Sequence, residues 1–131
     1  VLIVDDHDIN RRAIQLILQP LGCEIAQAAD GMAALAAAAT EPFDVIFMDV
    51  RMPELDGRET TRRLRATDGP NKDVPVIAVT ADTSEEDVRA CAAAGMTWFV
   101  AKPLTPASLL GALEAVLTGQ AELAAPETRA A

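Results

Sequence analysis

The sequence predicts an α/β domain in which a parallel sheet is covered by helices on both faces. Strand-like and helix-like segments alternate along the 131 residues, which is the pattern of a doubly wound fold. Residues 1–4 and 45–48 are continuous apolar runs rich in β-branched side chains, as strands buried on both faces of a parallel sheet require. A chain of this length fits one domain with one hydrophobic core.

Five strand–helix units are expected. The strands are predicted at residues 1–4, 24–28, 45–48, 76–79 and 98–101, and the helices at residues 9–21, 32–39, 57–66, 84–94 and 106–117. Asp30 is the predicted N-cap of the second helix, and Thr105 with Pro106 is the predicted start of the last one. Thr83 and Glu86 have the spacing of a capping box for the fourth helix.

Composition excludes several classes of function. The 11 basic and 20 acidic residues give a net charge of −9, which argues against nucleic-acid binding because phosphates need clustered Lys and Arg. Cys23 and Cys91 lie far apart without a CxxC motif, so a reducing cytoplasm is expected rather than a disulfide framework. The sequence has no apolar run of 18 residues, and no direct membrane contact is expected.

Two regions are predicted along the chain. Residues 1–118 form the folded domain, and residues 119–131, rich in Ala and Glu, are predicted to be a flexible tail. Because the chain begins within a strand and without Met, we expect it to be part of a longer protein.

Three acidic residues follow directly on apolar strands. Asp5 and Asp6 come after the first strand, and Asp49 comes after the third. Parallel strands meet at one carboxyl edge, where open α/β sheets bind ligands, so these carboxylates are expected to lie together. Neighbouring carboxylates repel each other unless a cation lies among them, and Mg²⁺ is commonly held by one or two carboxylates. The sequence therefore predicts a Mg²⁺ site.

The same edge is predicted to hold a hydroxyl and an amine. Thr80 follows the fourth strand and Lys102 the fifth. Acids, a metal ion, a fixed cation and hydrogen-bond donors are the components of phosphoryl transfer. Asp49 is the candidate nucleophile, because it is alone after the middle strand and an Asp can form an aspartyl phosphate.

Taken together, these residues resemble the receiver domain of two-component signalling proteins. The resemblance rests on residues 4–6 (VDD), 48–53 (MDVRMP) with 56–57 (DG), 80–81 (TA) and 102–103 (KP), and it spans nearly the whole chain. It implies a flavodoxin-like (βα)₅ fold with strand order 2-1-3-4-5. Residues 5–11 and 52–57 are most similar to receivers at the C-terminus of hybrid histidine kinases, although this chain has no kinase catalytic residues.

The resemblance implies a role for each matching residue. Asp49 would accept a phosphoryl group from a phosphohistidine. Asp6, Asp49 and the Arg51 carbonyl would bind Mg²⁺, and Asp5 would help to hold this ion through metal-bound water. Lys102 would pair with the phosphoryl oxygens. Thr80 would move toward them and Phe99, in place of the family's frequent Tyr, would turn inward, which would repack the surface of the fourth helix, fifth strand and fifth helix. The domain would thus phosphorylate and dephosphorylate itself.

The implied partner is a kinase dimerisation domain or a histidine phosphotransfer protein, which docks on the first helix of receivers. Ile9, Ala13, Leu16 and Ile17 are interpreted as the core stripe of that helix. Ile14 and Leu18 extend the apolar surface around the helix and, with Arg11, form the predicted partner face.

Two alternative functions remain. A phosphohydrolase of the haloacid dehalogenase type also uses Asp and Mg²⁺, but it needs a second Asp where this chain has Arg51. A receiver-like interaction module without phosphorylation is disfavoured because the acids, Thr80 and Lys102 are all present.

Two further hypotheses concern residues beside the predicted site. Arg51 and Asp82 are expected to pair across the phosphate and slow the attack of water. His7, the only histidine, has no second His or Cys nearby in the sequence, so a chemical role for it is disfavoured.

Overall fold

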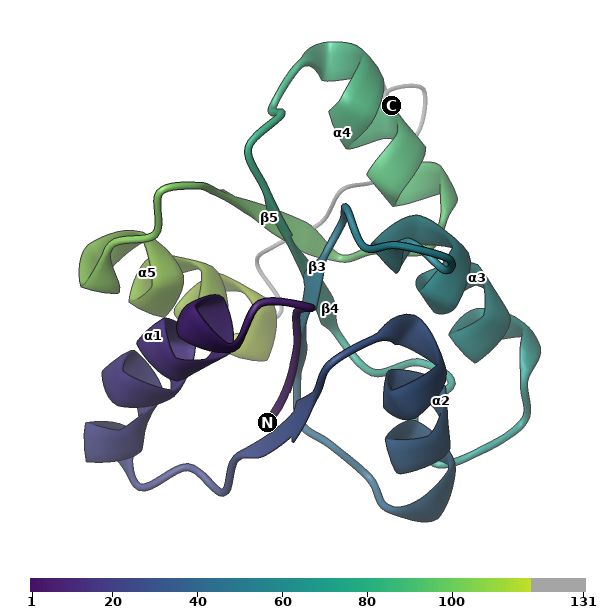
Figure 1. Cartoon of the computed structure of the whole chain (residues 1–131), viewed down its shortest axis with the longest axis horizontal. Coiled ribbons are helices and arrows are strands. Elements are labelled where there is room, and N and C mark those ends of the chain that lie inside the picture. The colour runs from purple at the N-terminus through teal and green to yellow at the C-terminus, as the bar shows by residue number, and fades with distance from the viewer. Residues whose placement is uncertain (119–131) are drawn as a thin grey trace.

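The computed structural model describes residues 1–118 and confirms the doubly wound architecture. One parallel sheet has the predicted order β2-β1-β3-β4-β5 (Figure 1). The strands are β1 (Leu2–Val4), β2 (Ala26–Ala28), β3 (Ile46–Asp49), β4 (Val76–Thr80) and β5 (Trp98–Ala101). The helices are α1 (Asp8–Leu18), α2 (Gly31–Thr40), α3 (Gly57–Ala66), α4 (Glu85–Ala93) and α5 (Pro106–Leu117), and a 3₁₀ turn, η1 (Gln19–Leu21), follows α1.

Two predictions concern regions at the limits of this description. The predicted tail, residues 119–131, lies outside the described residues. Within residues 1–118, no helix combines the length and apolarity that a membrane crossing requires.

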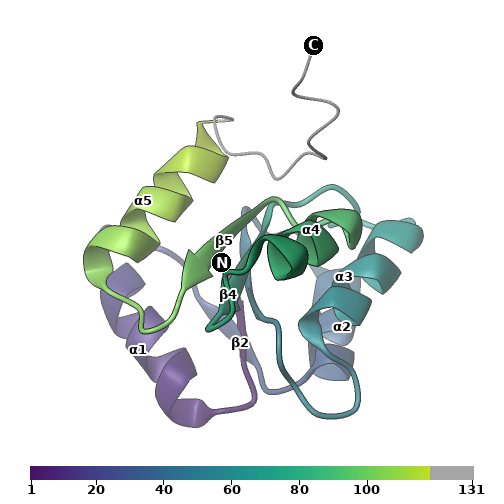
Figure 2. The ribbon, with the colours of Figure 1, turned by 90° about the horizontal axis from the view of Figure 1, so that it is seen from above.

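The sheet lies between two layers of helices. Helices α1 and α5 cover one face, and α2, α3 and α4 cover the other (Figures 1 and 2). Side chains alternate between these faces along each strand. Ile3, Phe47 and Ile77 are register partners on adjacent strands and all pack toward α1 and α5. Burying each such side chain stabilises the fold by about 1.5–3 kcal/mol, so the sheet rigidly positions the residues at its carboxyl edge.

Side-chain caps begin most of the helices. Asp30 Oδ1 accepts a hydrogen bond from Ala33 N (2.7 Å), which confirms the predicted cap of α2. Thr105 caps α5, with Pro106 at its first position, as predicted. Asp56 caps α3 in the same way and was not predicted.

The predicted Thr83–Glu86 capping box of α4 is wrong. Ser84 is the N-cap, and its hydroxyl accepts from Asp87 N (3.3 Å). The helix begins one residue later because the Asp82 carboxylate accepts a hydrogen bond from Ser84 N (3.0 Å) and so holds Ser84 in an Asx turn.

The predicted orientation of α1 is also wrong. Ile14 and Leu18 are buried against the sheet, whereas Ile9 and Leu16 are 81% and 59% exposed. Of the predicted core stripe, only Ile17 packs against the core. The apolar residues of this helix cover about half of its circumference, which is wider than the face that packs on the sheet, so periodicity alone does not select which of them are buried. The α-helix also ends at Leu18 rather than Leu21, because the chain tightens into η1 at Pro20.

Candidate functional site at the carboxyl edge of the sheet

Four strands bring the predicted site residues to one edge of the sheet. Asp5 and Asp6 directly follow β1, Asp49 is the last residue of β3, Thr80 is the last residue of β4, and Lys102 directly follows β5. The register pairs Val4 with Met48, so Asp5 and Asp49 continue two adjacent strands at the same level. Parallel pairing therefore gathers residues from across the sequence into one site, as expected.

The Asp5 carboxylate is buried, and hydrogen bonds to its Oδ1 atom hold it in place. This oxygen accepts a hydrogen bond from His7 N (2.8 Å) and one from Asn10 Nδ2 (3.5 Å). The other oxygen, Oδ2, is buried without a hydrogen-bond partner among the described residues, and so is Oδ1 of Asp6. Buried polar atoms without partners are rare and point to a group that completes them.

Asp49 is a buried carboxylate, and Lys102 is the one cation close to it among residues 1–118. Its Oδ1 lies 3.3 Å from Lys102 Nζ and accepts a hydrogen bond from Arg51 N (3.3 Å). Burial raises the pKa of Asp49 above its ordinary value, and the charge of Asp5 raises it further. Lys102 lowers this pKa but does not offset burial and Asp5. The three groups therefore leave an excess of negative charge at this edge.

The donor set fits a small, hard dication. Two buried carboxylate oxygens, from Asp5 and Asp6, have no hydrogen-bond partner, and Asp49 extends the same edge. Mg²⁺ binds through carboxylates and keeps several waters, which suits this partly open edge. Donor atoms of Asp5, Asp6 and His7 all lie within 4.8 Å of one another. His7 thus belongs to this cluster, although no pattern in the sequence indicates a chemical role for it.

Thr80 is bound to the following loop rather than to Asp49. The buried Thr80 hydroxyl donates to Asp82 O (3.2 Å) and accepts from Asp82 N (3.0 Å). The β4–α4 loop is therefore tied to the end of β4 through this one side chain.

A cluster of charges connects the site to α3 and α4. Arg51 Nη2 lies 3.7 Å from Asp82 Oδ2, which agrees with the expected proximity of these residues, and 3.6 Å from Asp87 Oδ2. Arg58 Nη1 on α3 lies 3.7 Å from Asp87 Oδ1. Hydrogen bonds from Ser84 lower the pKa of Asp82, which favours its charged form. The pairing of Arg58 with Asp87 was not predicted.

Gly57 allows the chain to approach Asp49 closely. A β-carbon at Gly57 would collide with the backbone carbonyl oxygen of Asp49. Gly57 N also donates to Val50 O (2.9 Å), which ties the start of α3 to the residue after Asp49. A side chain at this position would force α3 away from the site.

The predicted partner face on α1 needs correction. Ile14 and Leu18 are buried in the core, so they cannot present a surface. The Arg11 side chain is 14% exposed, and its Nη1 donates to Asp5 O (2.6 Å), where it supports the loop after β1. The exposed apolar surface of α1 is instead formed by Ile9, Ala13 and Leu16.

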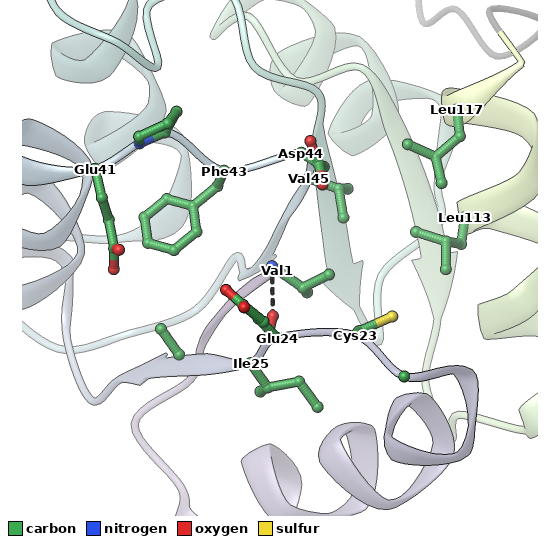
Figure 3. A pocket seen from close by; sticks show the side chains of 13 residues that line it. Val1, Cys23, Glu24, Ile25, Glu41, Phe43, Asp44, Val45, Leu113 and Leu117 are labelled. Carbon is green, nitrogen blue, oxygen red and sulfur yellow. Dashed lines mark hydrogen bonds between the residues drawn. The ribbon is translucent and has the colours of Figure 1, made fainter.

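A separate cavity of about 440 Å³ lies at the opposite edge of the sheet (Figure 3). Val1 and Val45, at the starts of strands, line it together with Leu113 and Leu117 of α5. Val1 N donates to Glu24 O there (2.8 Å). None of the residues predicted for the site reaches this cavity.

The family model described as "Response regulator receiver domain" matches residues 1–114. The chain belongs to this family. Receivers of solved structure share the fold: chemotaxis protein CheY4 of Vibrio cholerae is 39% identical, with a TM-score of 0.84 over 88% of this chain and 96% of that one. The receiver domain of sensor histidine kinase PA1611 from Pseudomonas aeruginosa is 37% identical, with a TM-score of 0.80 over 89% and 95% of the two chains. That structure is described with a magnesium ion coordinated in its active-site cleft.

Among curated relatives, this receiver is similar to parts of sensor histidine kinases. It is 37% identical over 111 residues to sensor histidine kinase GacS of Pseudomonas protegens, which covers 83% of this chain. It is 33% identical over 129 residues to the sensory/regulatory protein RpfC of Xanthomonas campestris, which covers 98% of this chain. The chain spans 12% and 18% of the lengths of these two relatives.

Proposed function

We propose that this receiver takes a phosphoryl group from a phosphohistidine onto Asp49. The supporting observation is the position of Asp49 at the end of β3, 3.3 Å from Lys102 Nζ and beside the buried Asp5. An Asp49 oxygen attacks phosphorus as the phosphorus–nitrogen bond to the donor imidazole breaks, and the imidazole leaves with the bonding electron pair and takes up a proton. Water later attacks phosphorus, which returns the Asp49 carboxylate and inorganic phosphate.

In this proposal the remaining site residues hold charge. Asp5, Asp6, Asp49 and the backbone carbonyl of Arg51 would hold Mg²⁺, which supplies positive charge to the phosphoryl oxygens. Lys102 Nζ already lies at Asp49 and needs little movement to reach an attached phosphoryl group. The buried, partnerless oxygens of Asp5 and Asp6 support this assignment.

The output would be a change of packing that begins at Thr80. Phosphorylated Asp49 offers the Thr80 hydroxyl a charged acceptor, and this bond competes with the two bonds to Asp82. Movement of Thr80 would free space behind it, into which Phe99 turns. The surface formed by α4, β5 and α5 would change as a result.

The proposed partner is a helical histidine-containing domain: a kinase dimerisation domain or a phosphotransfer protein. The exposed side chains of Ile9, Ala13 and Leu16 on α1 form an apolar strip at the edge of the site. Because α1 begins three residues after Asp5, a helix docked on this strip would carry its histidine close to Asp49. Phosphohistidine donors are made from ATP, so the proposal places this receiver in the cytoplasm.

The test is intact mass after incubation with acetyl phosphate, with and without Mg²⁺. We expect a Mg²⁺-dependent gain of one phosphoryl group in the unaltered chain and no gain in Asp49→Asn. Absence of both adduct and released phosphate would favour the interaction module without phosphorylation. Rapid phosphate release without an adduct would favour the phosphohydrolase.

A further inference from the structure

His7 Nδ1 and Asp6 Oδ1 lie 3.1 Å apart, and the two groups form an ion pair only if the imidazole is protonated. Their separation is within hydrogen-bond range, but Asp6 Oδ1 has no hydrogen-bond partner among the described residues. When Nδ1 carries no proton, its lone pair and those of Asp6 Oδ1 face the same space. A cation between His7 Nδ1 and Asp6 Oδ1 could accept a lone pair from each atom.

Asp5 belongs to the same group of donors. Its Oδ1 lies 3.6 Å from His7 Nδ1, and its Oδ2 is buried without a hydrogen-bond partner. The backbone fixes this arrangement, because His7 N donates to Asp5 Oδ1 (2.8 Å) immediately before α1 begins. His7 is thus held at the cluster by its own main chain, although its side chain is 69% exposed.

The separations match those of ligands that share one metal ion. Two donors about 2.1 Å from a metal stand about 3.0–3.4 Å apart at octahedral or tetrahedral angles. The contacts of His7 Nδ1 with Asp6 and Asp5, at 3.1 and 3.6 Å, need only small adjustments to reach that spacing. The three donors all lie within 4.8 Å of one another.

We propose that His7 Nδ1, with the carboxylates of Asp5 and Asp6, forms a site for borderline divalent cations such as Zn²⁺. Imidazole nitrogen suits Zn²⁺, Ni²⁺ and Cu²⁺, whereas Mg²⁺ keeps to oxygen ligands. The inference rests on the proposed function to the extent that the same two acids would hold Mg²⁺. The two kinds of ion therefore exclude each other, and Zn²⁺ would compete with the Mg²⁺ that phosphorylation requires.

His7 offers a direct readout because it is the only histidine in the chain. Its two ring nitrogens give separate ¹⁵N resonances, which can be followed while Zn²⁺ or Mg²⁺ is added to the full chain. We expect Zn²⁺ to shift the Nδ1 resonance much more than the Nε2 resonance, and we expect Mg²⁺ to leave both nearly in place. A Zn²⁺-induced shift at Nε2 alone, or no shift, would overturn the proposal.

Affinities measured by calorimetry give the second test. Loss of a ligand in His7→Ala should weaken Zn²⁺ binding by about tenfold or more relative to Mg²⁺ binding. Asp8→Asn removes a neighbouring charge outside the cluster. This variant should weaken the binding of Zn²⁺ and of Mg²⁺ by the same small factor. If His7→Ala lowered the affinities for Zn²⁺ and Mg²⁺ by the same factor, His7 would not be a ligand that favours Zn²⁺ over Mg²⁺.

The outcome can be separated from that of the proposed function. Labelling by acetyl phosphate with Mg²⁺ in the absence of Zn²⁺ tests only phosphorylation of Asp49. Normal labelling with no response of His7 to Zn²⁺ would refute this inference alone. A clear Nδ1 response without labelling would refute the phosphorylation proposal and leave the Zn²⁺ site standing.

Discussion

Lys102 Nζ lies 3.3 Å from Asp49 Oδ1, although 53 positions separate the two residues in the sequence. This single cation does not balance the site, because burial and the nearby Asp5 still raise the pKa of Asp49 above its ordinary value. The carboxylates of the site therefore repel each other, and the packing of the surrounding sheet keeps them close together. Charge repulsion of this kind lowers the stability of the fold while preparing the edge to bind a cation.

Replacing Asp49 should stabilise the metal-free protein. Because the folded-state pKa of Asp49 is raised, the folded protein binds more protons than the unfolded chain between the ordinary pKa and the raised one. Stability contributed by this group therefore falls as pH rises through that window, and the loss is complete above the raised pKa. In EDTA at pH 7, Asp49→Asn should raise the free energy of unfolding by about 0.5–2 kcal/mol, the usual size of single stabilising changes.

Urea unfolding at several pH values checks this expectation. The advantage of Asp49→Asn should shrink as pH falls toward the ordinary pKa of Asp, because the wild-type carboxyl is then neutral as well. Asp68→Asn is the matched control, since its side chain is 97% exposed. An Asn variant no more stable than the parent at pH 7 would contradict the account of the charge at this site.

The residues that lie at the carboxyl edge of the sheet could be predicted from the sequence. Strands buried on both faces have a plain apolar signature, and parallel pairing leaves little choice about where Asp5, Asp49 and Lys102 emerge. The orientation of α1 could not be predicted, because its apolar side is wider than the face that packs on the sheet. Which of them are buried, Ile14 and Leu18, depends on how the helix rests on the sheet.

Contacts between separate helices and loops likewise could not be predicted from the sequence. The ion pair of Arg58 with Asp87 depends on how α4 packs against α3. The cap at Ser84 depends on an Asp82 carboxylate that turns back on the loop. The position of His7 beside Asp6 depends on the turn between β1 and α1. Each of these features is set by the packing of elements in three dimensions and not by a local pattern of residue types.

Stability measurements should separate the buried and exposed sides of α1. Ile14→Ala and Leu18→Ala each remove a fully buried side chain and should cost about 2–5 kcal/mol of unfolding free energy. Ile9→Ala and Leu16→Ala change exposed positions and should stay within about 0.5 kcal/mol of the parent. Urea midpoints with equal m-values would measure all four. A large cost at Ile9 together with a small one at Leu18 would return the helix to the orientation first expected from the sequence.

Arg51 should lengthen the life of the phosphorylated state. Its guanidinium lies 3.7 Å from Asp82 Oδ2 and 3.6 Å from Asp87 Oδ2, and these pairs bridge the loops beside the proposed phosphoryl position. Arg51→Ala would open this bridge to attacking water. Exposed ion pairs contribute about 1 kcal/mol at most, so we expect up to about a fivefold faster loss of phosphate.

The rate can be followed by intact mass after acetyl phosphate is removed. Arg62→Ala is the matched control, because Arg62 is similarly exposed and pairs with Glu59 on the same helix, away from the bridge. It should decay at the parental rate. Equal lifetimes for Arg51→Ala and the parent would remove Arg51 from the control of hydrolysis.

Phosphorylation should change the fluorescence of Trp98, the only tryptophan. The rings of Trp98 and Phe99 are adjacent, with centroids 6.0 Å apart and planes tilted by 34°. If Thr80 leaves Asp82 for the phosphoryl group and Phe99 turns inward behind it, the surroundings of Trp98 change at the same moment. Mg²⁺ with acetyl phosphate should therefore shift or quench the emission of the parent chain.

Thr80→Ala separates the switch from the chemistry that triggers it. The Ala side chain cannot donate to the phosphoryl group, so the variant should gain the phosphoryl mass and yet lose most of the fluorescence change. Thr67→Ala is the control for removal of a threonine hydroxyl, because Thr67 is exposed and its hydroxyl donates to Arg63 O at the end of α3. It should keep the parental response. A full fluorescence change in phosphorylated Thr80→Ala would show that the movement of Phe99 does not require Thr80. Phosphorylation of Asp49 would then affect β5 through other residues.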